Sequence, residues 1–135
     1  MDTVALDRQL SDLLYVLMKA LRSGYSLRRS LEAVTESAPE PTAGAFKGWL
    51  TDLEAGCTYD EAFANLQAAW PSPYLAQIVA AIIRNQKSGG NLAAQLEPLA
   101  ERIYQAAGTD EAFYPEMRRQ AEQLGGPLPE RVQKG

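Results

Sequence analysis

A motif that recurs every 32 or 33 residues constrains the fold of this chain more than any other feature of its sequence. Each copy is a glycine, then a capping residue, then two large apolar residues at fixed offsets. The three copies are Gly24, Ser26, Leu27 and Leu31; Gly56, Thr58, Tyr59 and Phe63; and Gly89, Asn91, Leu92 and Leu96, with Gly90 directly after Gly89. Glycine closes many helix C-termini, and serine, threonine or asparagine caps helix N-termini. Each copy therefore predicts a helical hairpin.

Apolar spacings on both sides of each glycine predict six helices. Leucines three and four residues apart mark the first helix, over residues 4–22. The second helix is expected from Leu27 to the break at Pro39 and Pro41, and the third over 42–55. The fourth is expected from the Thr58 and Glu61 capping box to the break at 70–73, the fifth over 74–87, and the sixth from Asn91 through Ile103. A single hairpin cannot bury its own apolar stripes. The predicted fold is therefore all-α, an antiparallel six-helix bundle built from three helical hairpins.

Two positions complicate the last third of this pattern. Pro98 lies inside the sixth helix, where it removes a backbone hydrogen bond and predicts a kink. After Gly108, a short additional C-terminal helix is predicted by Phe113, Met117, Ala121 and Leu124, with Pro115 interrupting it. Residues 125–135 are expected to form a mobile terminus. The expected division is a helical domain over 1–108 and a C-terminal extension over 109–135.

Composition excludes many kinds of functional site. The chain contains no histidine and one cysteine, Cys57, so imidazole and thiolate metal sites and Ser-His-Asp triads cannot be built. A net charge of -4 argues against general nucleic-acid binding. The adjacent carboxylates at 60–61 and 110–111 fall in expected first turns, where acids favour the helix dipole. The sequence therefore predicts a protein that is not an enzyme and that uses no cofactor or metal.

Two segments resemble the F domain of type II secretion systems, which also occurs in the platform proteins of type IV and tight-adherence pili. LLYVLMKALRSGYSLRRSLEAV, residues 13–34, is similar to the opening of that domain. IVAAIIRNQKSGGNLAAQLEPLAERI, residues 78–103, is similar to its closing hairpin, in which a Gly-Gly-Asn-Leu turn is typical. The resemblance spans about residues 10–105.

This resemblance implies a six-helix bundle on the cytoplasmic side of the bacterial inner membrane, with no catalytic residues. It also implies contact with the assembly ATPase and with other platform subunits, and self-association is a further expectation. Platform proteins carry transmembrane helices beside this domain, whereas the residues after Ile103 are polar. The chain is therefore interpreted either as a piece of a longer protein or as a variant without its own anchor, and membrane contact is expected only through flanking segments or a basic turn.

The charge distribution selects one candidate partner surface. Between Leu13 and Leu31 the charged residues are all basic, namely Lys19, Arg22, Arg28 and Arg29. A basic turn suits an acidic face of the ATPase or anionic lipid head groups, and a solvated loop is the alternative interpretation. Trp49, Tyr59, Phe63 and Trp70 are expected in the core rather than in a binding site. The functional hypothesis is a non-catalytic scaffold that couples the ATPase to pilus or pseudopilus assembly, and its rival is a stand-alone helical adaptor or regulator.

Overall fold

The computed structural model describes residues 3–108 and residue 119, and within them all regular secondary structure is α-helix. The helices are α1 (Thr3–Arg22), α2 (Leu27–Ser37), α3 (Thr42–Glu54), α4 (Tyr59–Ala69), α5 (Pro73–Ser88) and α6 (Leu92–Ala107). The first five lie within a residue or two of their predicted ranges, and α6 runs four residues past its predicted end at Ile103. The predicted all-α class and the six-helix bundle of three hairpins are confirmed.

The predicted caps begin the helices as expected. The Ser26 side chain accepts from the backbone N–H of Arg29, and the Asn91 side chain accepts from that of Ala94. At α4 the capping box is complete, since Thr58 Oγ1 accepts from Glu61 N at 3.1 Å and Glu61 Oε1 accepts from Thr58 N at 2.9 Å. Each cap satisfies N–H groups that the first helical turn leaves unpaired. The sequence therefore fixes where each returning helix starts.

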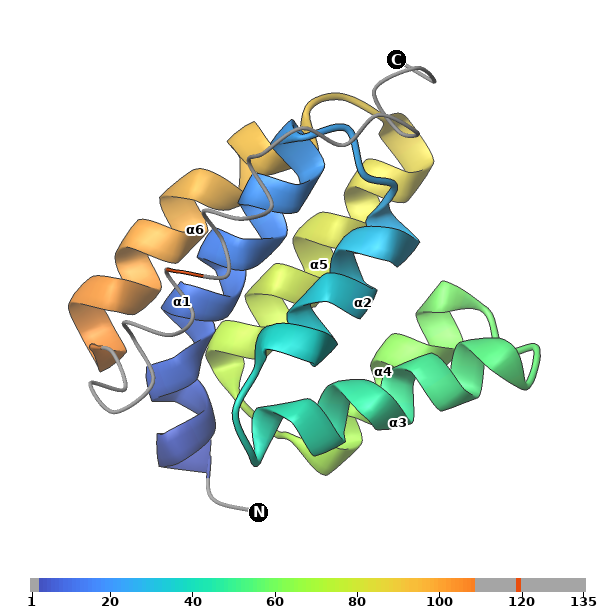
Figure 1. The fold of residues 1–135 in the computed structure, drawn as a ribbon, viewed down its shortest axis with the longest axis horizontal. Helices are drawn as coiled ribbons and strands as arrows, with labels where there is room; N and C mark the ends of the chain where they lie inside the picture. The colour runs from blue at the N-terminus through green and yellow to red at the C-terminus, as the bar shows by residue number, and fades with distance from the viewer. Residues whose placement is uncertain (1–2, 109–118, 120–135) are drawn as a thin grey trace.

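The six helices close into a ring (Figure 1). Each helix packs against the next one along the chain, and α6 returns to pack extensively on α1. Because α1 also contacts α2 and α5, its residues are buried on almost every side, including the polar Gln9, Ser11 and Asp12. A helix buried all round is the centre of a bundle rather than a surface helix. The chain is thus organised around α1.

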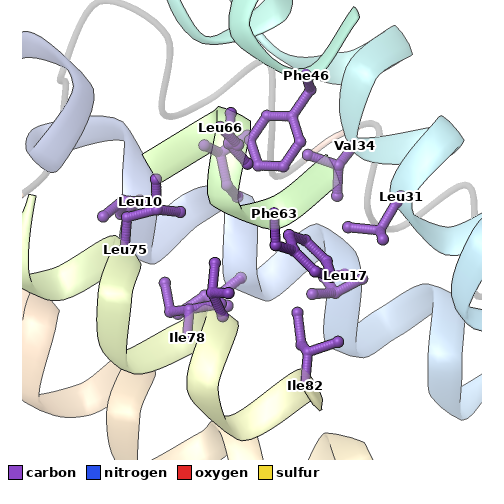
Figure 2. A pocket seen from close by; sticks show the side chains of 13 residues that line it. Leu10, Leu17, Leu31, Val34, Phe46, Phe63, Leu66, Leu75, Ile78 and Ile82 are labelled. Atoms are coloured by element: carbon purple, nitrogen blue, oxygen red, sulfur yellow. The ribbon is translucent and has the colours of Figure 1, made fainter. Parts of the chain in front are cut away.

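The interior is a single apolar cluster to which all six helices contribute. Figure 2 shows Leu10 and Leu17 of α1 converging with Leu31 of α2, Phe63 of α4, and Leu75 and Ile82 of α5. The gap between these side chains has a volume of about 20 Å³ and exposes no polar atom. A space of that size holds about one water molecule, and apolar cavities of this kind stay dry. The gap is a packing defect and not a ligand site.

Buried polar contacts tie α1 to the two connections between hairpins. The Gln9 side chain accepts a short hydrogen bond from the Thr42 hydroxyl, and its amide donates to the Glu40 carbonyl at 3.4 Å. Ser72, the N-cap of α5, donates to Asp7 at 2.6 Å. Gln9, Thr42 and Ser72 are all buried. The end of the bundle that holds these connections is therefore cross-linked by side chains in its interior.

Pro98 lies on the exposed side of α6, which continues as one helix to Ala107. A kink of the helix axis at this residue stays a prediction. The additional C-terminal helix and the mobile terminus predicted for 109–135 fall outside the described residues, except for Arg119.

Candidate functional site

The described residues contain no group of three or more acidic, histidine or cysteine side chains that could hold a metal ion. Of the adjacent carboxylates, Glu61 serves the α4 capping box, and Asp60 lies 4.0 Å from Lys87 at the end of α5. The second pair, Asp110 and Glu111, lies outside the described residues. Both carboxylates of the first pair, Asp60 and Glu61, thus have structural partners, as the sequence predicted.

The aromatic residues lie mainly in the core. Trp49, Phe63 and Trp70 are buried, and Tyr59 is half-buried. The rings of Trp49 and Phe63 stack with centroids 5.7 Å apart, and Phe46 meets Trp70 edge to face at 6.2 Å. The core interpretation of these residues is confirmed. Among the described residues the one large apolar side chain that is strongly exposed is Tyr104.

The first and third turns that carry the repeated motif lie at one end of the bundle, because α1 and α6 run antiparallel. Arg22, the last residue of α1, lies 2.7 Å from Glu97 near the start of α6. The second turn, between α3 and α4, lies at the tip of its own hairpin (Figure 1), and Asp60 beyond it approaches Lys87 near the end of α5. The structure therefore brings together the turns at Gly24 and Gly89, which are far apart in the sequence. We call this end the turn end.

The first two turns have the same backbone geometry. In each, the backbone N–H of the third residue after the helix donates to the carbonyl five residues earlier, from Tyr25 to Ala20 O at 3.1 Å and from Cys57 to Asp52 O at 3.0 Å. The glycines between, Gly24 and Gly56, take φ values of +93° and +98° and donate to the carbonyls of Leu21 and Leu53. This is the pattern by which glycine ends a helix in the Schellman motif. Cys57, the one cysteine of the chain, lies partly buried against the core in the second copy.

The third turn is built differently, although its sequence follows the same motif. The side-chain amide of Asn85 donates to the carbonyls of both Gly89 and Gly90 at 3.1 Å, and it also reaches Gln95 at 3.3 Å. Asn85 thus clamps the Gly89–Gly90 turn from within α5. Sequence reasoning missed Asn85, because its only signal is a side-chain amide four residues before the glycine pair.

We expect Gly56→Ala to lower the free energy of unfolding by about 1–2 kcal/mol, since a side chain at positive φ is strained even where space is free. No atom lies within 4 Å of the position that a Cβ on Gly56 would occupy, so this effect is conformational rather than steric. Gly48 is the matched control: it is exposed within α3 and also has open space around it. Gly48→Ala is expected to stabilise the protein by about 0.5–1 kcal/mol. Urea denaturation of both variants measures the difference, and equal effects would contradict the assigned turn geometry.

The four predicted basic residues fall into separate groups at the turn end. Arg22 faces α6 and pairs with Glu97, whereas Arg29 pairs with Glu32 at 3.6 Å and Glu36 at 3.2 Å within α2. Arg28 lies 3.9 Å from Glu32, and Lys19 is half-buried on α1. The guanidinium of Arg29 also lies 5.6 Å from the Tyr25 ring centroid. The turn is therefore basic in sequence, but acids of α2 and α6 largely balance its charge in space.

A groove opens between the first and third hairpin turns. Its walls are formed by residues at the ends of α1 and α5 and at the starts of α2 and α6, among them Leu21, Arg22, Leu27, Asn85, Asn91 and Leu92. We call it the turn groove. Two copies of the repeated motif, beginning at Gly24 and Gly89, thus contribute to one surface.

Comparison with known proteins identifies one family. The model of the family described as "Type II secretion system (T2SS), protein F" matches residues 13–118. No curated protein and no solved structure matches the chain. The matched range extends ten residues past Gly108 (118 − 108 = 10), the predicted end of the helical domain. Among the described residues, no helix combines the length and the apolar character needed to cross a membrane.

Proposed function

Since the chain belongs to the type II secretion system protein F family, we propose that it is a non-catalytic scaffold domain on the cytoplasmic side of the bacterial inner membrane. In this role it couples the assembly ATPase to pilus or pseudopilus assembly through direct contact with the ATPase and with platform subunits. The observation that carries the proposal is the family match, which covers most of the bundle, from the middle of α1 to beyond α6.

The shape of the bundle supports this role. The interior is filled by apolar side chains, and the gap between the core residues of Figure 2 has a volume of about 20 Å³, the size of one water molecule. A well-packed interior resists deformation and transmits displacement between its ends. One end is cross-linked by the Gln9, Thr42 and Ser72 contacts, and the other presents the first and third turns. We propose that the turn end is the contact surface and that the packed helices carry force away from it.

The proposal places the contact with the ATPase at the basic residues of the first turn, Lys19, Arg22, Arg28 and Arg29. Arg28 and Arg29 are partly exposed, and their partners Glu32 and Glu36 lie on the same surface of α2. Exposed ion pairs of this kind contribute only about 0–1 kcal/mol each. An acidic face of a partner can therefore compete for these guanidinium groups at low energetic cost.

We expect the double change Arg28→Gln and Arg29→Gln to weaken binding of the purified assembly ATPase about tenfold, or ~1.4 kcal/mol, in a calorimetric titration. Glutamine removes both charges while keeping long side chains that suit a helix. The stronger change of both residues to glutamate should weaken binding further. Raising the salt concentration should reduce wild-type affinity more than that of the glutamine variant.

The matched control changes Lys47 and Arg102 to glutamine, which removes the same total charge. Both residues are exposed, on α3 and α6 respectively, outside the first turn. This variant should bind the ATPase like the wild type. Equal weakening by both variants would show that only net charge matters, and absence of binding by the wild type at high micromolar concentration would remove the ATPase as a direct partner.

A further inference from the structure

The turn groove has the layout of a small docking site, with apolar side chains below and polar ones around the edge. Leu21 and Leu27 are half-buried and leave part of their surface open to the groove, whereas Leu92 is buried among its lining residues. Arg22, Gln86 and Asn91 supply hydrogen-bonding groups beside them. Protein interfaces commonly combine an apolar centre with a polar rim.

The ion pair at the edge of the groove shows which ligand chemistry Arg22 accepts. Arg22 Nη2 lies 2.7 Å from Glu97 Oε2, in a charge-assisted hydrogen bond that joins α1 to α6. The two side chains remain 49% and 67% exposed, so water and other carboxylates reach both groups. An exposed pair of this kind exchanges partners readily, because solvent screens it.

From these observations we infer that the turn groove binds a protein segment that presents a carboxylate beside an apolar side chain. The carboxylate of the partner takes the place of Glu97 on Arg22, and the apolar side chain packs on Leu21, Leu27 and Leu92. Glu97 is then an internal competitor that occupies Arg22 until the partner arrives. This inference rests on the proposed function, in which the assembly ATPase supplies the acidic segment.

Charge complementarity distinguishes this groove from the other groove on the surface, between α1 and α6. The α1–α6 groove is bordered by Glu97 and Glu101 and has no basic residue among its lining residues. The turn groove contains the guanidinium of Arg22 and the exposed side-chain amide of Gln86, and its lining residues include no acid. An acidic segment therefore fits the turn groove and is repelled by its neighbour.

The test compares ATPase affinity of the full chain carrying Glu97→Gln, Arg22→Gln or Glu101→Gln with that of the wild type by calorimetric titration. Glu97→Gln should tighten binding about two- to fivefold, because it removes the exposed carboxylate that competes with the partner for Arg22. Arg22→Gln should weaken binding about tenfold. Glu101→Gln is the matched control, since Glu101 lies one turn further along α6 and accepts from Gln105 rather than from Arg22; its affinity should equal that of the wild type.

The outcomes separate this inference from the proposed function. If the wild type binds but the Glu97 and Arg22 variants bind with the same affinity, the groove is not the site and the scaffold role stands. If neither the wild type nor Glu97→Gln binds, both ideas are overturned. Two further results would replace the ATPase as the occupant: Glu97-dependent dimerisation in sedimentation equilibrium, which indicates a second copy, or Glu97-dependent binding to vesicles containing phosphatidylserine, which indicates lipid.

Discussion

Phe63→Ala is expected to lower the free energy of unfolding by about 3–5 kcal/mol, a large part of the total stability of a domain of this size. Phe63 is 1% exposed, and its ring contacts those of Trp49 and Tyr59 with centroids 5.7 and 6.2 Å away. It also faces the small cavity seen in Figure 2. Removal of the ring would enlarge a space that is already empty, where neighbouring helices have little freedom to close in.

The control for this prediction is Phe63→Leu, which keeps most of the apolar volume and should lower the free energy of unfolding by only about 1–2 kcal/mol. Urea denaturation followed by circular dichroism gives both values. The midpoint for the alanine variant should fall by roughly 1–5 M, given a slope of about 1–3 kcal/mol per M. Equal midpoints for the two variants would show that Phe63 does not fill the centre of the bundle.

Thr42→Val is expected to lower the free energy of unfolding by about 1–3 kcal/mol, although valine has nearly the same shape as threonine. The Thr42 hydroxyl is fully buried and donates to the buried side chain of Gln9. Valine cannot donate, so the Gln9 oxygen loses a hydrogen bond that it cannot regain from bulk water. The destabilisation therefore reports on the link between α1 and α3.

Thr35→Val is the matched control for that change. Thr35 is also buried within a helix, but its hydroxyl donates to the Leu31 carbonyl of its own helix at 3.0 Å. Loss of such a local bond leaves the helix hydrogen bonds intact, so the effect should stay within about 0.5 kcal/mol. If both threonines tolerate valine equally in thermal denaturation, the hydroxyl of Thr42 makes no net contribution to stability.

The sequence predicted the helices and their order well, because their determinants are local. Spacings of three and four residues define an apolar face, and Ser26, Thr58 and Asn91 begin helices through hydrogen bonds to residues three positions away. Glycines at 24 and 56 end helices by a backbone conformation that other residues avoid. Each of these devices acts within one or two turns of the chain, and each was recognised correctly.

Features that depend on contacts between distant segments could not be predicted in the same way. An apolar stripe shows that a helix is buried on one side, but it does not reveal that α6 returns to pack on α1. The polar residues Gln9 and Thr42 look solvent-exposed in sequence, because their partners lie about thirty residues away. Likewise, the run of basic residues in the first turn suggested one positive surface, whereas Glu97 and the acids of α2 divide and balance it.

The packing of α6 against α1 has a consequence for how such a bundle combines with other polypeptides. Because the first and last helices pack against each other in antiparallel order, the start of α1 and the end of α6 lie at the same end of the molecule, opposite the first and third turns (Figure 1). Domains whose entry and exit points lie together can be inserted into a loop of a host protein without separating the host's own segments. The bundle is thus suited to act as an insertable module. A host protein can hold it at two neighbouring points, with the first and third turns of the bundle facing away from the host.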